Sequence, residues 1–221
     1  MSHNTPSPNP RPPRPAYRPL TAHRVKTLGQ DLPPHTQRDV DARMADIARL
    51  LRAVAPDLRP PNRYRYAWSM RCLEELVEAL SFAHYLRHQR LMTPAEAQAA
   101  MPAASDEGPA LALTLADYMY GVFDLFGELM RFATVQRGEV LAPRGESPRR
   151  RTILRDIQEL ACAFEMLPHV PTKDYRCKMD AMRQSVRKVE NLGYGLVVRG
   201  SERRDGWVPD MDDQRPEPAS P

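Results

Sequence analysis

The chain has 221 residues, of which 42% are hydrophobic, and this is enough to bury the core of one globular domain. Its formal net charge of +4 is too small a basic excess to indicate a nucleic-acid partner by itself. The 3 cysteines lack the spacing of zinc ligands, no apolar run is long enough for a membrane span, and no signal-peptide core follows Met1. We therefore expect a soluble intracellular protein with reduced thiols and no membrane contact.

Proline is concentrated at the two ends of the chain. Residues 1–35 carry prolines among Asn, Ser and Arg, and such a stretch buries too little apolar surface to order itself. We expect a disordered arm there, and a flexible polar tail over residues 201–221. Residues 36–200 are then expected to form one helical domain.

The first half of that domain is predicted to contain two long helices and one short helix. Thr36 is the expected N-cap of the first, and Pro56 follows its end. Asn62 is expected to cap a second helix that continues to about Gln89. The segment Thr93–Glu96 has the pattern of a capping box, with proline at the first helical position.

The second half is predicted to contain three more helices. A capping box at Thr114–Asp117 starts the central one, which should run to about Gln136. Ser147–Pro148 is expected to open the next, and Thr172 to cap the last, which should stop at Gly200. Apolar residues recur at alternating steps of four and three, which is typical of helices packed at shallow angles. The predicted fold is an all-α bundle of long, mostly antiparallel helices.

The central helix carries a narrow polar stripe on an otherwise apolar surface. Its exceptions to apolar character recur at steps of four and three: Asp117, Gly121, Asp124, Glu128 and Arg131. A helix that is apolar nearly all round is usually buried, and a buried carboxylate must be paired or must bind a metal. The partners of Asp124 and Glu128 therefore bear directly on function.

A second pair of acids lies on the preceding long helix. Glu75 and Glu78 are three residues apart and share a face, as Asp124 and Glu128 do at a spacing of four. If the two faces meet, four carboxylates converge, and their pKa values rise unless a cation lies between them. Oxygen ligands in that number suit Mg²⁺ or Mn²⁺ rather than zinc. Such a site could cleave a phosphodiester.

The same residues allow a second interpretation. Arg71 and Arg131 could neutralise the acids as ion pairs inside the bundle, and the spacing alone leaves both interpretations open. Arginines are also candidate phosphate contacts, and those considered for nucleic-acid binding are Arg71, Arg131, Arg183 and Arg187.

Several longer stretches resemble one known family. LTLADYMYGVFDLFGELMR, VEALSFAHYL and KVENLGYGLVVRGSE occur in the order found in the translin superfamily, over roughly Tyr64 to Met211. Within that superfamily they are most similar to the branch of translin-associated factor X. The acid at Asp124 is typical of this branch, whereas translin has an apolar residue there.

The resemblance implies an all-α bundle and a catalytic role. Factor X is the catalytic subunit of a Mg²⁺-dependent endoribonuclease with translin, a closed shell that cuts single-stranded or nicked RNA. The complex acts in passenger-strand removal during RNA silencing and on fragments of transfer-RNA maturation. The family's catalytic acids correspond to Glu75, Glu78, Asp124 and Glu128, which would bind Mg²⁺ or Mn²⁺. We therefore expect a translin partner and a cytoplasmic and nuclear location.

Two rival functions remain, and the resemblance has one departure. The chain could be a translin-like protein that binds single-stranded RNA or DNA without cutting it, or a helical assembly scaffold. Family members also carry a further long helix before the one expected at Thr36, where this chain is rich in proline.

Overall fold

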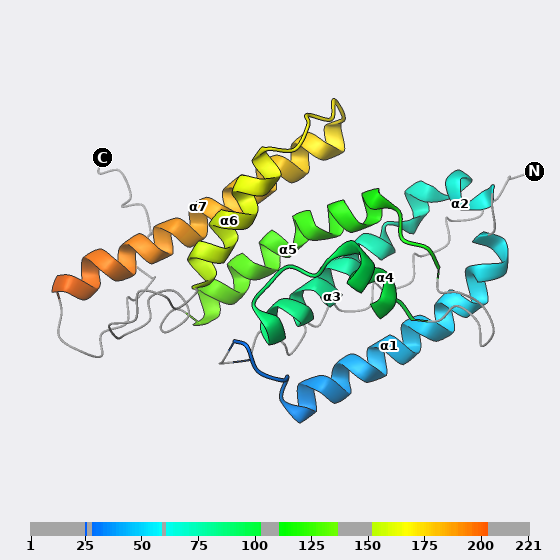
Figure 1. Ribbon diagram of the computed structural model, residues 1–221, viewed down its shortest axis with the longest axis horizontal. Coiled ribbons are helices and arrows are strands. Elements are labelled where there is room, and N and C mark those ends of the chain that lie inside the picture. Colours follow the sequence, from blue (N-terminus) through cyan, green and yellow to red (C-terminus); the bar gives the residue numbers. More distant parts are fainter. Residues whose placement is uncertain (1–24, 26–27, 59–60, 103–110, 137–151, 203–221) are drawn as a thin grey trace, which may run out of the picture.

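The computed structural model describes residues 25, 28–58, 61–102, 111–136 and 152–202. These residues form helices and no strand, which confirms the predicted all-α class. No described helix is long and apolar enough to cross a membrane. The elements are, in chain order (Figure 1), α1 (Pro34–Val54), η2 (Ala55–Leu58), α2 (Asn62–Arg65), η3 (Ala67–Met70), α3 (Cys72–His88), α4 (Pro94–Ala100), α5 (Leu115–Gln136), α6 (Ile153–Glu165) and α7 (Lys173–Glu202).

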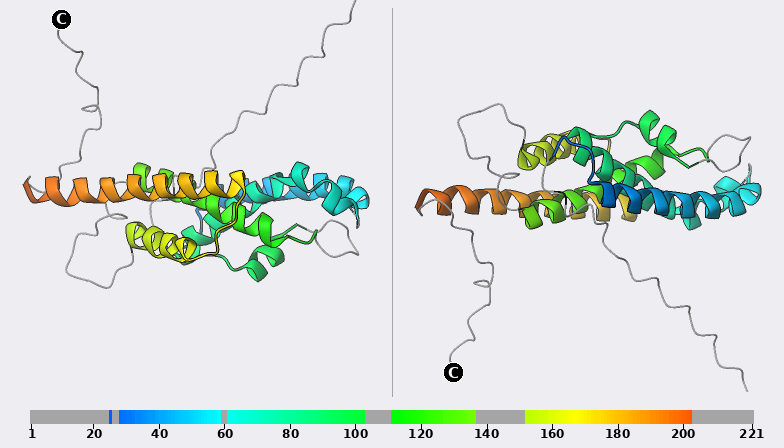
Figure 2. Two further views of the ribbon diagram at one scale, coloured as in Figure 1. Left: turned by 90° about the horizontal axis from the view of Figure 1, so that it is seen from above. Right: turned by 90° about the horizontal axis from the view of Figure 1, so that it is seen from below.

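The helices α3 and α5 form the centre of an elongated molecule. α1 lies at one end and α7 extends beyond the other helices at the opposite end, as both views in Figure 2 also show. The main core joins α3, α5, α6 and α7, and its fully buried side chains include Phe82, Phe126, Phe132, Ile157 and Met182. Each such side chain stabilises the fold by roughly 1.5–3 kcal/mol.

The two central helices are an exception to the mostly antiparallel arrangement that the sequence predicts. Val77 and Phe82 of α3 contact Gly121 and Phe132 of α5, respectively, so these two neighbours run parallel. The chain returns through α4 before α5 begins, and this permits the parallel arrangement. α6 and α7, joined by the short connection 166–172, run antiparallel as expected.

Three predicted helix starts are confirmed by hydrogen bonds. Thr93 and Glu96 form a full capping box at α4. Thr114 and Asp117 exchange backbone-to-side-chain bonds of 2.8 and 3.1 Å at the start of α5. The backbone N–H of Tyr175 donates to Thr172 Oγ1 at 3.2 Å, which caps α7. Short-range polar spacing therefore locates these ends correctly.

The N-terminal starts are wrong. α1 begins at Pro34 with Pro33 as its N-cap residue, and the Thr36 side chain is buried inside the helix rather than capping it. The continuous helix expected from Asn62 to Gln89 is divided into α2, η3 and α3. The break follows from Tyr66, whose backbone leaves the helical region at φ −103° and ψ 14°.

Two further ends differ. The predicted start at Ser147–Pro148 lies outside the described residues, and α6 begins at Ile153 with Thr152 as its N-cap. α7 continues past Gly200 to Glu202.

The segment before α1 belongs partly to the core. Val25 and Leu32, which the sequence analysis assigns to a disordered arm, are buried. Gln136 Nε2 donates to the Val25 carbonyl at 2.6 Å, and the Gly29 N–H donates to the Leu86 carbonyl at 2.9 Å. The predicted domain start at residue 36 is therefore too late. Residues 1–24 and 203–221 of the predicted arm and tail lie outside the described residues.

Candidate functional site

The polar stripe of α5 faces α3 across Gly121. A Cβ atom at this position would lie 2.6 Å from the Cβ of Val77 and 2.7 Å from the carbonyl oxygen of Glu74. Only glycine allows two helix backbones to approach this closely. Because Asp124 and Glu128 follow Gly121 on the same side of α5, the close contact directs both toward α3.

Three carboxylates come together at this contact. Burial and the nearby charges of Glu128 and Asp124 raise the pKa of Glu78 to about 8. Glu128 is only 3% exposed, and Asp124 and Glu78 are half-buried. No ion-pair partner of Glu78 is found among the described residues. Three of the four predicted acids therefore lie near one another, and their role as ligands stays a prediction.

Glu74, rather than the predicted Glu75, is the partly buried acid at this end of α3. Glu75 is exposed, and its charge has the smallest effect on the pKa of Glu78. The side chain of Glu74, in contrast, is 13% exposed and contacts α7 through Lys178. The spacing of four between Glu74 and Glu78 was the available signal, because it matches the spacing of the acids on α5.

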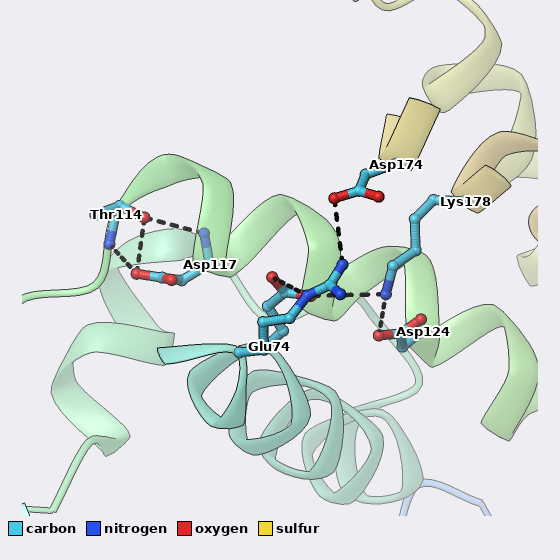
Figure 3. Close-up of polar contacts among 7 residues, drawn as sticks. Glu74, Thr114, Asp117, Asp124, Asp174 and Lys178 are labelled. Atoms are coloured by element: carbon cyan, nitrogen blue, oxygen red, sulfur yellow. Dashed lines mark hydrogen bonds and ion pairs between the residues drawn. The ribbon is translucent and has the colours of Figure 1, made fainter. Parts of the chain in front are cut away.

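Two basic side chains pair with the cluster. Lys178 of α7 donates to Asp124 and lies 3.7 Å from Glu74 Oε2, so that its ammonium sits between α3 and α5 (Figure 3). Arg131 donates to Glu128 from one turn further along α5. Of the two arginines weighed as partners in the sequence analysis, Arg131 pairs with Glu128, whereas Asp124 pairs with Lys178, which was not predicted.

Arg71 is the third cation near these acids. It pairs with Asp174 of α7 at 3.4 Å and lies 3.9 Å from Glu74. The side chains of Arg71 and Arg131 are more than half exposed, so both remain accessible from solvent. They are the two predicted phosphate contacts that lie beside the carboxylates.

The other two predicted phosphate contacts lie elsewhere. Arg183 makes a bidentate ion pair with Glu165 of α6, at 2.6 and 2.7 Å. Arg187 is exposed one turn later on α7. These residues are therefore not brought to the carboxylate cluster.

Asp117, at the start of the stripe, has a structural role. Its carboxylate accepts hydrogen bonds from Thr114 and from Arg63 Nη2, the latter at 2.6 Å. Both Arg63 and Asp117 are buried. The pair joins α2 to the first turn of α5, which fixes the register of the stripe against α3.

The donor chemistry of the cluster fits a hard divalent cation, although its present arrangement does not form a metal cage. Among the described residues, no group of three or more His, Cys, Asp or Glu side chains is placed to hold a metal ion. Two of the three acids are engaged by Lys178 and Arg131. Carboxylate oxygens are, however, the ligands that Mg²⁺ and Mn²⁺ prefer.

The fold and the site define a class of protein: an all-α bundle with an acid cluster between two parallel helices. The sequence profile of the translin family matches residues 20–200, and the chain belongs to this family. It is 32% identical to Translin-associated protein X of Rattus norvegicus over 150 residues, 59% of this chain and 49% of the relative. It is 26% identical to the Translin-associated protein X homolog of Schizosaccharomyces pombe over 132 residues, 60% of this chain and 52% of the relative.

Translin itself is also a relative. Translin of Gallus gallus is 30% identical over 138 residues, 62% of this chain and 57% of the relative. The chain thus spans about half the length of the curated relatives it matches, a little more for translin.

Proposed function

We propose that this protein is the metal-dependent endoribonuclease subunit of a complex with translin, acting on single-stranded RNA. The observation that carries the proposal is the meeting of Glu78, Asp124 and Glu128 at the α3–α5 contact. Burial, together with the charges of Glu128 and Asp124, raises the pKa of Glu78 to about 8. A glutamate whose pKa is raised this far, beside two further acids, is typical of a functional site.

Glu78, Asp124 and Glu128 would hold the ion. A divalent cation bound there would activate a water molecule and stabilise the leaving oxygen of a phosphodiester. Glu78, whose pKa lies near neutrality, can hold or accept a proton at its carboxylate. Arg71 and Arg131 are exposed beside the acids and can contact phosphate oxygens.

The names of the relatives support the partner. Translin-associated protein X is named for its association with translin, and this chain is similar to it over more than half of its own length. The helical bundle supplies the surface for such a complex, and nucleic-acid binding is proposed for the complex rather than for this chain alone.

The proposal is tested by cleavage of a labelled single-stranded RNA with purified translin and Mg²⁺. Glu128→Gln removes one charge at a buried acid without changing its shape, and we expect cleavage to fall about 100-fold or more. RNA binding should persist. The matched control is Glu159→Gln on the exposed surface of α6, which should cut like the wild type. Equal cleavage by Glu128→Gln and the control would overturn the catalytic proposal.

A second candidate function is single-stranded RNA or DNA binding without cleavage. The ion pairs of Asp124 with Lys178 and of Glu128 with Arg131 favour it, because they neutralise the acids without a metal. In that case the wild-type complex would bind the labelled RNA and leave it intact in Mg²⁺ or Mn²⁺.

A further inference from the structure

Lys178 is a largely buried lysine that contacts two other helices. Its side chain is 19% exposed and comes from α7. It donates to Asp124 of α5 and lies 3.7 Å from Glu74 of α3 (Figure 3). It also lies 5.9 Å from the centroid of the Tyr120 ring of α5. Lysine is seldom buried unless it is paired, so this placement depends on the acids around it.

The ammonium lies beside Asp124, which is one of the proposed metal ligands. Burial raises the pKa of Glu74, and the charge of Lys178 opposes that rise. Lys178 thus places a positive charge beside both Glu74 and Asp124. A carboxylate oxygen that accepts from an ammonium cannot bind Mg²⁺ with the same lone pairs.

We propose that Lys178 is a built-in counter-ion that competes with the divalent cation for Asp124, so that metal loading requires displacement of its ammonium. This inference rests on the proposed metal site and adds a residue that limits its affinity. It also explains why the described acids are close together without forming a metal cage. Lys178 neutralises the Asp124 carboxylate until a divalent cation displaces the ammonium.

An alternative partner for the displaced ammonium lies on the same helix. Asp174 precedes Lys178 by four residues, the spacing at which an acid and a following lysine interact favourably on a helix surface. Asp174 is exposed and now pairs with Arg71 at 3.4 Å. Displacement would therefore move a flexible side chain by one helical turn and leave the ammonium paired.

The test measures the stabilisation of the full chain by Mg²⁺ or Mn²⁺ alone. The melting temperature is recorded against metal concentration, because a ligand that binds only the folded state stabilises it by RT ln(1 + [L]/Kd). Fitting this relation gives Kd, which is the half-saturating metal concentration. Lys178→Met removes the competing charge and keeps an apolar stem of similar length. We expect the half-saturating metal concentration to fall about tenfold. Lys178→Gln, which keeps a polar head, should shift it in the same direction and serves if Lys178→Met folds poorly.

Two controls separate this effect from general electrostatics. Lys188→Met removes the same charge from an exposed position of the same helix. It should leave the half-saturating metal concentration close to that of the wild type. In an Asp124→Asn background, Lys178→Met should give no gain, because the contested carboxylate is gone.

An unchanged or higher half-saturating metal concentration in Lys178→Met would overturn the inference. The absence of any metal response in all variants would overturn it too. Binding that appears only in Lys178→Met supports it. Failure of the nuclease proposal is seen separately, as RNA cleavage that does not depend on Glu128.

Discussion

Gly121 of α5 faces Val77 of α3 at a distance that excludes a side chain. A Cβ atom at position 121 would approach the Val77 Cβ to 2.6 Å. We predict that Gly121→Ala destabilises the fold by about 1–3 kcal/mol, because the helices must separate. Gly127→Ala is the matched control on the same helix, since its Cβ meets nothing within 4 Å.

The control should be neutral or stabilising by up to about 1 kcal/mol, because alanine is the better helix former. Urea unfolding followed by circular dichroism measures both. Equal stability changes in the two variants would contradict the close contact between α3 and α5.

Glu78 should make stability depend on pH. Its pKa is about 8 in the folded protein against 4.5 ordinarily, so the folded state keeps a proton that the unfolded chain has lost. The free energy of unfolding therefore falls as the pH rises from about 4.5 to about 8. Above this range Glu78→Gln should be more stable than the wild type by roughly 2 kcal/mol after allowance for solvent screening.

Denaturant titrations at a series of pH values check this prediction. Glu75→Gln is the neighbouring control, and because Glu75 is exposed, we expect it to follow the wild-type profile. If Glu78→Gln also keeps the wild-type slope between pH 5 and about 8, the acids are not coupled as described.

Arg63 is predicted to be the most sensitive basic residue for stability. It pairs at 2.6 Å with Asp117, and both side chains are buried. Arg63→Met leaves the Asp117 carboxylate buried and without its cation, which should cost about 3–5 kcal/mol. Arg155→Met breaks an exposed ion pair with Glu159 and should change stability only slightly. Thermal unfolding of the two variants gives the comparison, and similar losses would show that the buried pair has no special weight.

Local sequence patterns predicted several helix ends correctly and missed others for a physical reason. Capping by Thr114 and Thr172 depends on residues only three positions away, so the pattern contains the whole interaction. Thr36 has the same residue type, but its side chain is buried within α1 and makes no cap hydrogen bond. The break at Tyr66 follows Arg63, whose partner Asp117 is 54 residues away, so the local pattern does not contain this interaction.

The candidate site was predicted in composition more accurately than in detail. The spacing of Asp124 and Glu128 identified the polar face of α5, and Gly121 was already part of that stripe. Periodicity could not decide between Glu74 and Glu75, which are adjacent in sequence and differ only in which way α3 is rotated. Lys178 could not be assigned at all, because nothing in the sequence of α7 indicates that it packs against α5.

The buried Val25 and Leu32 bear on how this protein should be shortened for expression. A version that begins at residue 36, where the proline-rich composition ends, would lack the buried side chains of Val25 and Leu32. It would also leave the Gln136 amide and the Leu86 carbonyl without the partners they have in the intact chain. Shortened versions that retain Val25 should stay folded and monodisperse. The version that begins at residue 36 should expose apolar core surface and aggregate.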